Sequence, residues 1–357
     1  MNMAFKALAD WGLPLSRHGL IIIAGPCAAE SEEQVLGTAL AVAQSGLSLF
    51  RAGVWKPRTR PGTFEGMGEA AFPWLRNARE KTGVGFAVEV ANAHHVETAL
   101  RHGADALWIG ARTTVTPFAV QDIADALRGT DVPVFVKNPV NPDLELWTGA
   151  IERVAGAGVT RLAAVLRGVS GLAAGPYRNA PDWAMALELR QRMPGLPLLC
   201  DPSHIAGKAE LVPEIAQQAL NLNADGLMIE THVSPAEALS DQRQQLSPAQ
   251  FAELMGQLVV KAHDDTASRR VQEALAACRC EIDQADRTLL ATLARRMEMS
   301  RRIGELKKSE NLAVLQSGRW EQVLGRAVEN GQKLGLDEGF IRDIFNRIHV
   351  ESIAQQQ

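Results

Sequence analysis

Short apolar runs rich in Leu, Ile and Val alternate with segments of helical spacing along most of the chain, from residue 20 to about residue 230. The alternation predicts eight strands, each followed by a helical segment such as 31–44 or 94–101. Eight consecutive units favour an α/β fold with a closed (β/α)8 barrel, although an open doubly wound sheet can also hold eight strands. The expected strands are 20–25, 47–53, 84–90, 106–111, 132–137, 161–166, 196–201 and 225–230.

The pattern changes after residue 261. The sequence HDDTAS at 263–268 is typical of a linker, and beyond it the chain has no proline and no strand-like run. We therefore expect a barrel domain over 1–262 and a small all-α domain over 269–357. Residues 269–308 are interrupted only by Gly304, which predicts a helix of roughly 60 Å at about 1.5 Å per residue. A helix of that length requires a partner helix along it.

Composition narrows the class of protein. Lys and Arg number 37 against 41 Asp and Glu, a near balance that argues against a nucleic-acid or membrane-surface partner. Apolar runs fall well short of the roughly 20 residues of a membrane helix, so we expect a cytoplasmic protein. The four cysteines form no CxxC pair, which favours reduced thiols over a disulfide framework or a zinc ribbon.

Chemically active side chains follow the expected strands one after another. In a barrel the carboxyl ends of all strands meet on one face, where such folds place their chemistry. A single polar residue there carries no information, but a series at successive strand ends is hard to assign to solvation. The series is Cys27, Arg51, Glu89, Arg112, Lys137, Arg167, Asp201 with His204, and Glu230.

Four of these strand-end and loop residues offer mixed donors for a metal. Cys27 supplies a thiolate, His204 an imidazole, and Glu230 and Asp241 two carboxylates. This set suits Mn, Fe, Co or Zn better than Mg or Ca. Each residue alone also has an ordinary structural explanation, such as a buried cysteine or a helix cap. Their convergence on one face is the expectation that favours the metal.

A second group of residues is cationic. Arg51, Lys56, Arg58 and Arg60 surround a proline-containing loop, and Arg112, Lys137 and Arg167 follow later strands. Arginine forks match phosphate oxygens, so this face suits small, strongly anionic substrates. The alternative is ordinary ion pairing with acids such as Glu65, Glu69 and Glu89.

The motifs AGPC, RAGVWKPRT, GART, DPSH, and IETH followed by ALSD resemble 3-deoxy-D-arabino-heptulosonate 7-phosphate (DAHP) synthase of the type I beta group, over residues 18–246. The resemblance implies a divalent metal, Mn first, on Cys27, His204, Glu230 and Asp241. It implies phosphoenolpyruvate at Arg51, Lys56, Ala111, Arg112, Lys137 and Arg167, and erythrose 4-phosphate at Lys56, Pro57, Arg58 and Thr59. The stretch NPVNPDLELWTG after Lys137 departs from the family pattern in length and polarity.

The implied chemistry is attack of carbon 3 of phosphoenolpyruvate on an aldehyde whose oxygen a metal polarises. Lys137 is then a substrate-holding catalytic cation, and Glu89 and His204 are candidates for proton transfer. A class I aldolase, with Lys137 as its Schiff-base residue, is the alternative from another class. Octulosonate and sialic acid synthases share the phosphoenolpyruvate chemistry, but the KPRT motif argues against both.

On spacings of three and four, the helical tail carries cations among apolar residues, which calls for an anionic partner. The segments RCEIDQADRTLLATLARR, IGELKK, GRWE and HVESIAQQQ resemble the all-helical AroQ type of chorismate mutase over 269–357. The resemblance implies a homodimer and a chorismate site, with Arg279 reaching into the site of the partner chain and with Arg296 and Lys307 as the catalytic cations. Its other residues are Arg319, Ser352 and Gln356. Gln316 and Trp320 depart from the family pattern, where many members have Asp and Glu.

Two expectations concern the fusion itself. A first-step enzyme joined to a domain that binds a late metabolite predicts feedback inhibition of the barrel by prephenate or chorismate. The competing interpretation of the tail is a non-catalytic domain that dimerises and senses prephenate.

Overall fold

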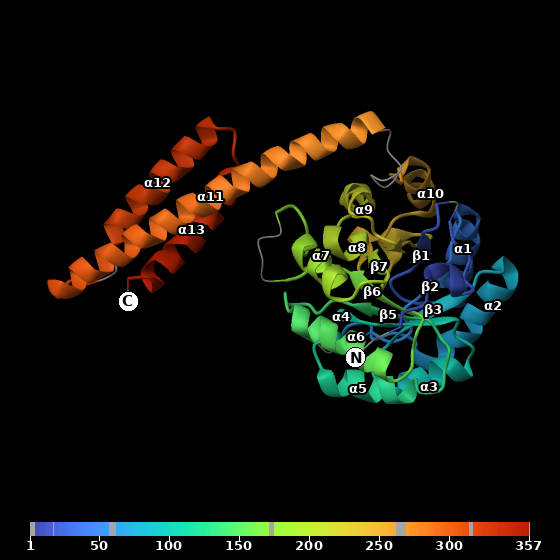
Figure 1. The fold of residues 1–357 in the computed structure, drawn as a ribbon. Coiled ribbons are helices and arrows are strands. Elements are labelled where there is room, and N and C mark those ends of the chain that lie inside the picture. Colours follow the sequence, from blue (N-terminus) through green and yellow to red (C-terminus); the bar gives the residue numbers. More distant parts are fainter. Residues whose placement is uncertain are drawn as a thin grey trace. The chain divides into compact units, whose positions relative to one another are not determined.

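The computed structural model describes residues 4–16, 18–56, 62–170, 175–261, 269–313 and 317–356, without the side chains of 317–319. Within these ranges the chain forms two compact units, Met1–Lys261 and Ala262–Gln357 (Figure 1). The expected linker at 263–268 lies outside the described residues.

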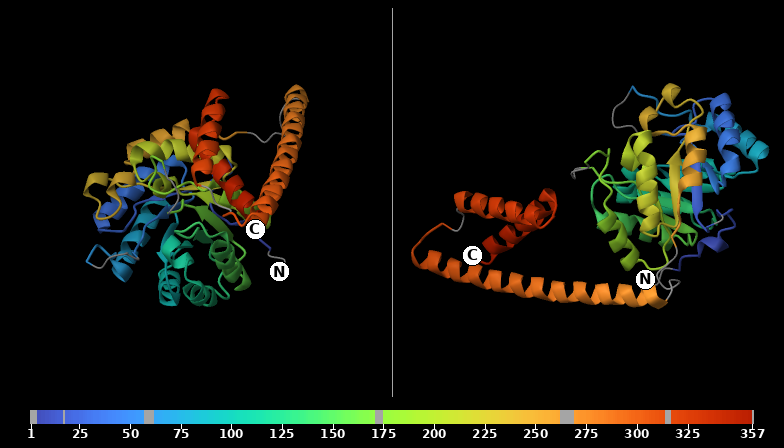
Figure 2. Two further views of the ribbon diagram at one scale, coloured as in Figure 1. Left: turned by 90° about the vertical axis from the view of Figure 1, so that its left-hand side faces the viewer. Right: turned by 90° about the horizontal axis from the view of Figure 1, so that it is seen from above.

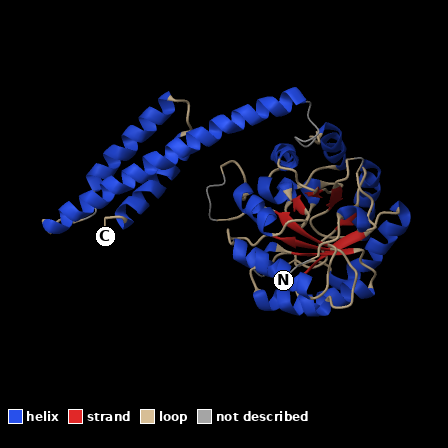
Figure 3. Ribbon diagram, viewed as in Figure 1, coloured by secondary structure: helices blue, strands red, loops and turns tan. Residues whose placement is uncertain are grey.

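The first unit is a closed parallel barrel in which each strand pairs with the next one along the chain and β8 pairs with β1 (Figure 3). The predicted (β/α)8 fold is therefore confirmed. Each strand lies within the range expected from the apolar runs. The strands are β1 (Ile21–Gly25), β2 (Leu49–Arg51), β3 (Phe86–Val90), β4 (Ala106–Ile109), β5 (Val134–Lys137), β6 (Leu162–Leu166), β7 (Leu198–Cys200) and β8 (Gly226–Glu230).

Helices surround the barrel, as the views in Figures 1 and 3 show. The α-helices are α1 (Glu32–Val42), α2 (Phe72–Thr82), α3 (Ala93–Arg101), α4 (Ala111–Thr114), α5 (Pro117–Ala126), α6 (Leu144–Gly156), α7 (Trp183–Arg192), α8 (Pro202–Ala206), α9 (Val212–Asn221) and α10 (Pro248–Gln257). Short 3-10 helices are η1 (Leu8–Asp10), η2 (Ala43–Ser45), η3 (Gly68–Ala71), η4 (Ala209–Leu211), η5 (Pro235–Glu237) and η6 (Gln242–Gln244).

Two apolar layers explain why the strands are apolar throughout rather than alternating. Ile21 and Ile23 belong to the core inside the barrel, whereas Ile22 and Ala24 pack under the outer helices. Both faces of each strand are thus buried, as in other parallel barrels. Trp11 packs against the inner core, with its ring centroid 5.7 Å from that of Phe135. The N-terminal segment thereby covers the amino ends of the strands and leaves chemistry to the carboxyl ends.

The second unit consists, in its described part, of α11 (Arg269–Ser309), α12 (Ser317–Lys333) and α13 (Glu338–Ala354). Figure 2 shows α11 as one long helix, whose carboxyl half packs against α13, and α13 in turn packs against α12. Gly304 permits this contact, because a Cβ there would lie 2.7 Å from the Gln356 backbone. In the amino half of α11, Ile282, Leu289 and Leu290 are exposed. No described helix is long and apolar enough to cross a membrane.

Candidate active sites

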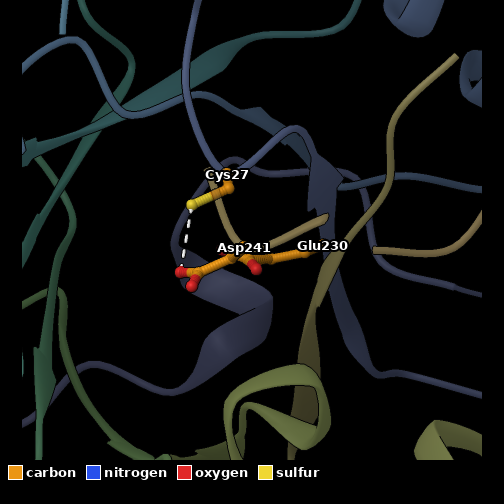
Figure 4. Close-up of side chains that lie close together, drawn as sticks. All are labelled: Cys27, Glu230 and Asp241. Carbon is orange, nitrogen blue, oxygen red and sulfur yellow. Dashed lines mark hydrogen bonds between the residues drawn. The ribbon is translucent and has the colours of Figure 1, made fainter. Parts of the chain in front are cut away.

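Three of the four predicted metal ligands cluster where β1 meets β8 (Figure 4). Cys27 follows β1 directly, Glu230 is the last residue of β8, and Asp241 lies in the loop after β8. Their donor atoms all lie within 4.8 Å of one another, and Cys27 Sγ is 3.4 Å from Asp241 Oδ2. Because β1 and β8 are neighbours in the closed barrel, residues more than 200 positions apart share one site.

Two backbone conformations create this cluster. Gly25 has a φ of +149°, and a Cβ there would lie 2.1 Å from the Arg51 carbonyl oxygen. Only glycine therefore lets the chain leave β1 close to β2 and present Cys27. Asp241 adopts a left-handed conformation with a φ of 48°, which is uncommon outside glycine and often marks a functional position.

His204 joins the cluster from α8. Asp201, directly after β7, caps this helix by accepting a hydrogen bond from the His204 backbone at 3.0 Å. The imidazole Nε2 lies 3.8 Å from Glu230 Oε1 and 4.0 Å from Asp241 Oδ2, while Nδ1 lies 2.8 Å from Asp201 Oδ2. The four residues thus bring one sulfur, one nitrogen and two carboxylate donors together. Such a set fits a borderline divalent ion and does not fit Mg or Ca.

The pKa of the thiol and the pKa values of the two carboxylates are shifted in opposite directions. Burial, reinforced by Glu230, raises the pKa of the Cys27 thiol to about 12. Burial also acts to raise the pKa of Glu230, but His204 and Arg51 outweigh it and hold that pKa below its usual value. The pKa of Asp241 is likewise lowered by His204 and Arg178 against the effect of burial. The site therefore offers ionised carboxylates and a thiol whose proton a bound cation would displace.

Arg51 is the most enclosed of the predicted anion-binding cations. Its Nη2 donates to Glu230 Oε1 at 3.0 Å, and its guanidinium lies 4.9 Å from the centroid of the Trp108 ring. Its Nε and Nη1 are buried and have no hydrogen-bond partner among the described residues. A buried donor without a partner costs free energy, so these two groups are well placed to bind an anion.

Lys137 and Arg167 complete the buried cations. Lys137 Nζ is 2.6 Å from Asp201 Oδ2. Burial lowers the pKa of Arg167 to about 10, with Asp201 partly opposing the effect, so this guanidinium is charged but poorly solvated. The buried cations line one small pocket together. Its lining residues are Arg51, Lys56, Glu89, Gly110, Ala111, Arg112, Lys137, Val140, Arg167, His204 and Asp241.

The KPRT loop is only partly described. Lys56 donates to the Cys27 carbonyl oxygen and lies 3.2 Å from Cys27 Sγ. Burial alone would lower the pKa of Lys56, but Cys27 and Glu89 outweigh it and the net pKa is raised. Pro57, Arg58 and Thr59 lie outside the described residues.

The buried cations Arg51 and Lys137 do form ion pairs, as the alternative of ordinary ion pairing expects, but their partners are not Glu65, Glu69 or Glu89. Arg51 pairs with Glu230 and Lys137 with Asp201, both inside the site. Glu69 instead accepts from His102 at 2.7 Å on the outer surface. The stretch after Lys137 is anchored at its start, because Asn138 accepts from the Arg167 backbone and donates to Gly168.

The sequence placed Asp201 in the series at the strand ends without a specific role, and it gave no role to Arg178, Gln244 or Gln245. Asp201 contacts both Lys137 and His204, and the other three contact the predicted metal ligands. The DPSH motif carried a signal for Asp201, since an Asp three residues before His on a short helix is a natural cap. The glutamines of DQRQQL carried none, because glutamine is common in exposed loops.

The helical unit gathers part of the predicted mutase site. Arg296 donates to Ser352 Oγ and, at 3.5 Å, to the Ile348 carbonyl oxygen, and no described carboxylate pairs with it. Burial lowers the pKa of Arg296. Lys307 is half-buried further along α11, and Gln356 carries a buried Oε1 with no described partner.

Arg279 stands apart from this group. It lies 17 residues before Arg296 on the same helix, which is roughly 25 Å at about 1.5 Å per residue. Trp320 stacks on His349 with ring centroids 3.9 Å apart, where the family resemblance expects a glutamate. Gln316 and the Arg319 side chain lie outside the described residues.

Residues 16–264 match the DAHP synthetase I family. The chain belongs to that family. Residues 278–357 match chorismate mutase type II. The chain therefore joins a DAHP synthase domain to a chorismate mutase domain, which confirms the resemblance drawn from its motifs and shows a bifunctional enzyme of the shikimate pathway.

Individual relatives agree with the DAHP synthase assignment. Phospho-2-dehydro-3-deoxyheptonate aldolase of Thermotoga maritima is 32% identical over 66% of this chain and 68% of its own length. A crystal structure of the DAHP synthase of Thermotoga maritima superimposes with a TM-score of 0.64 and 29% identity, over 71% of this chain and 73% of that one. A 2-dehydro-3-deoxyphosphooctonate aldolase of Bradyrhizobium sp. is 27% identical over 67% of this chain and 87% of its own length.

Proposed function

We propose that the DAHP synthase domain condenses phosphoenolpyruvate with erythrose 4-phosphate in a reaction that depends on a divalent metal. The observation that carries this proposal is the four-residue donor set beside the buried guanidinium of Arg51, two of whose nitrogens have no described hydrogen-bond partner. Cys27, His204, Glu230 and Asp241 would hold the ion, with manganese as first choice and Co, Fe or Zn as alternatives. Bound there, the metal supplies Lewis acidity to the aldehyde oxygen.

The protein's own groups hold and orient the substrates. Arg51 Nε and Nη1, Lys137, Arg167 and the more exposed Arg112 bind the phosphate and carboxylate of phosphoenolpyruvate. Holding two multiply charged molecules side by side lowers the barrier that their mutual repulsion imposes in water. Water adds at carbon 2 and phosphate leaves, with Glu89 or His204 moving the proton.

A Schiff-base mechanism is less well supported. Lys137 Nζ is buried and ion-paired with Asp201 at 2.6 Å, whereas a nucleophilic amine must lose its proton. Borohydride trapping with a keto substrate tests this alternative, since the metal-dependent route forms no adduct.

The decisive assay combines phosphoenolpyruvate with erythrose 4-phosphate before and after chelator treatment. We expect activity to disappear with the metal and to return on addition of Mn²⁺. Full activity after demonstrated metal removal contradicts the role of Cys27 and His204. Because the octulosonate relative shares much of the barrel, arabinose 5-phosphate serves as the competing aldehyde, and we expect it to be the poorer substrate.

We further propose that the chorismate mutase domain converts chorismate to prephenate as a homodimer. This rearrangement needs no acid, base or metal, only a cage of cations that favours the compact conformer. Arg296 and Lys307 supply such charges, with Ser352, Gln356 and Arg319 beside them. Arg279, too distant within its own chain, contacts the substrate bound by the partner. The exposed Ile282 and Leu289 support a helix-to-helix dimer contact. An assay of mutase turnover by the isolated helical tail distinguishes a catalytic domain from one that only dimerises and senses prephenate.

We also propose that the enzyme acts in the cytoplasm.

Finally, we propose that prephenate or chorismate, bound at the helical domain, inhibits the synthase activity of the barrel. A coupling of about 1–3 kcal/mol gives a 5- to 150-fold effect. Titration of synthase activity with prephenate, in the intact chain and in a protein ending at Lys261, tests the regulation. Inhibition that persists in the active truncated protein rules it out.

A further inference from the structure

Two adjacent glutamines, Gln244 and Gln245, lie behind the four-residue cluster in the loop between β8 and α10. Each is only 1% exposed. A buried amide is costly unless its donors and acceptor are satisfied, so the partners of these side chains are informative. Both side chains direct hydrogen bonds to predicted metal ligands or to the backbone next to them.

Gln244 bridges the two carboxylates. Its Nε2 donates to Glu230 Oε2 at 2.7 Å, and its Oε1 accepts from Arg178 Nη1 at 2.8 Å. The same Arg178 nitrogen donates to Asp241 Oδ1 at 3.0 Å. One amide and one guanidinium thus form a continuous chain of hydrogen bonds from Glu230 to Asp241.

The chain of bonds leaves one oxygen of each carboxylate facing the cluster. Glu230 Oε1 lies 3.8 Å from His204 Nε2, and Asp241 Oδ2 lies 4.0 Å from the same nitrogen and 3.4 Å from Cys27 Sγ. The opposite oxygens are those held by Gln244 and Arg178. Arg51 Nη2 also donates to Glu230 Oε1 at 3.0 Å. Asp241 is therefore oriented from behind by Arg178, whereas Glu230 is held on one oxygen by Gln244 and on the other by Arg51.

Gln245 acts on the third ligand. Its Oε1 accepts from the Cys27 backbone N–H at 2.9 Å, and its Nε2 donates to the Ser240 carbonyl oxygen at 2.9 Å. Ser240 directly precedes Asp241, so this side chain ties the Cys27 backbone to the turn that carries Asp241.

We propose that Gln244 and Gln245 are positioning residues of the metal centre: Gln244, with Arg178, orients Glu230 and Asp241, and Gln245 fixes Cys27. The inference rests on the proposed metal dependence. A neutral amide suits the task because it donates to one carboxylate and accepts from an arginine, whereas a glutamate would repel Glu230 and a lysine would partly cancel the ligand charge. Such outer partners govern metal affinity in other proteins.

The test measures binding of Co²⁺ alone to the full-length protein by visible and near-ultraviolet absorption, which reports thiolate coordination separately from affinity. We expect Gln244→Met and Arg178→Met to weaken Co²⁺ binding about 10- to 100-fold while retaining the thiolate band at saturation. Gln245→Met should alter the thiolate band itself. Gln257→Met is the matched control, because the Gln257 side chain donates to Glu253 within α10 rather than to a predicted metal ligand, and it should change neither property.

The outcomes separate the two proposals. Co²⁺ affinity within twofold of wild type in folded Gln244→Met overturns the role of Gln244. If Gln244→Met does not fold, Arg178→Met decides, since the Arg178 side chain is 45% exposed and tolerates replacement. An unchanged thiolate band in Gln245→Met overturns the role of Gln245. Absence of Co²⁺ binding in the wild-type protein overturns the metal centre and this inference with it.

Discussion

The barrel site and the helical site differ in how many of their predicted residues meet within one chain. In the barrel, ligands from β1, β8 and α8 converge within one unit, and buried hydrogen bonds hold them. In the helical unit, Arg296 and Ser352 meet, but Arg279 lies about 25 Å away and Leu289 is 57% exposed. Closure of a barrel brings distant residues together by itself, whereas in the described part of the helical unit only the carboxyl half of the longest helix packs against another helix of that unit.

The largest effect is expected from Cys27→Ala. This change removes the sulfur donor of the proposed metal site, so synthase activity should fall below detection. Mutase activity should remain within about twofold of wild type, because the two sites lie in separate compact units. Parallel assays of both activities on the same folded preparation check this prediction. An equal loss of both activities contradicts the independence of the two sites.

Arg296→Ala should show the converse selectivity. Removal of one preorganised charge contact typically costs about 10²–10³ in kcat, or roughly 2.7–4 kcal/mol. We therefore expect such a loss for the mutase and an unchanged synthase. Steady-state kinetics with chorismate measure the effect, and a near-normal kcat would mean that Arg296 points to water rather than to substrate.

The dependence of mutase activity on the proposed dimer is tested with Leu289→Asp. A charge on the exposed apolar stripe of α11 should weaken the dimer, so mutase activity per chain should drop about tenfold or more and become concentration-dependent. Synthase activity should change far less. Gln284→Asp places the same charge on an exposed position off that stripe and serves as control. Sedimentation of both variants alongside the assays shows whether the loss follows dissociation.

The smallest effect concerns pH. Burial, with Arg296 adding to it, lowers the pKa of His349 below its usual value of about 6.5. The unfolded chain then binds more protons than the folded one near that value, so the helical unit should lose stability as pH falls through about 6.5. Thermal unfolding at pH 5.5 and 7.5 should show a smaller difference in His349→Phe, which retains an aromatic partner for Trp320. If the two pH values differ in unfolding temperature by the same amount in His349→Phe and in the wild type, His349 is not the cause of the pH dependence.

The sequence by itself favoured the barrel over an open sheet and indicated which face carries the chemistry. Eight apolar runs end in active side chains, and the carboxyl ends of parallel strands in a barrel must converge. Cys27, His204 and Glu230 were therefore placed together without knowledge of any loop. The long helix was also readable, since 269–308 lacks proline and contains only one glycine.

The tertiary structure alone decided which groups hold those side chains. Lys137 pairs with Asp201 rather than with Glu65, Glu69 or Glu89, and Gln245 bonds to Cys27 across 218 positions. The contact of Gln245 accompanies the left-handed turn at Asp241 and the close approach of β1 to β2 at Gly25. No local periodicity encodes such contacts, because hydrogen bonds between loops are fixed only once the barrel has closed.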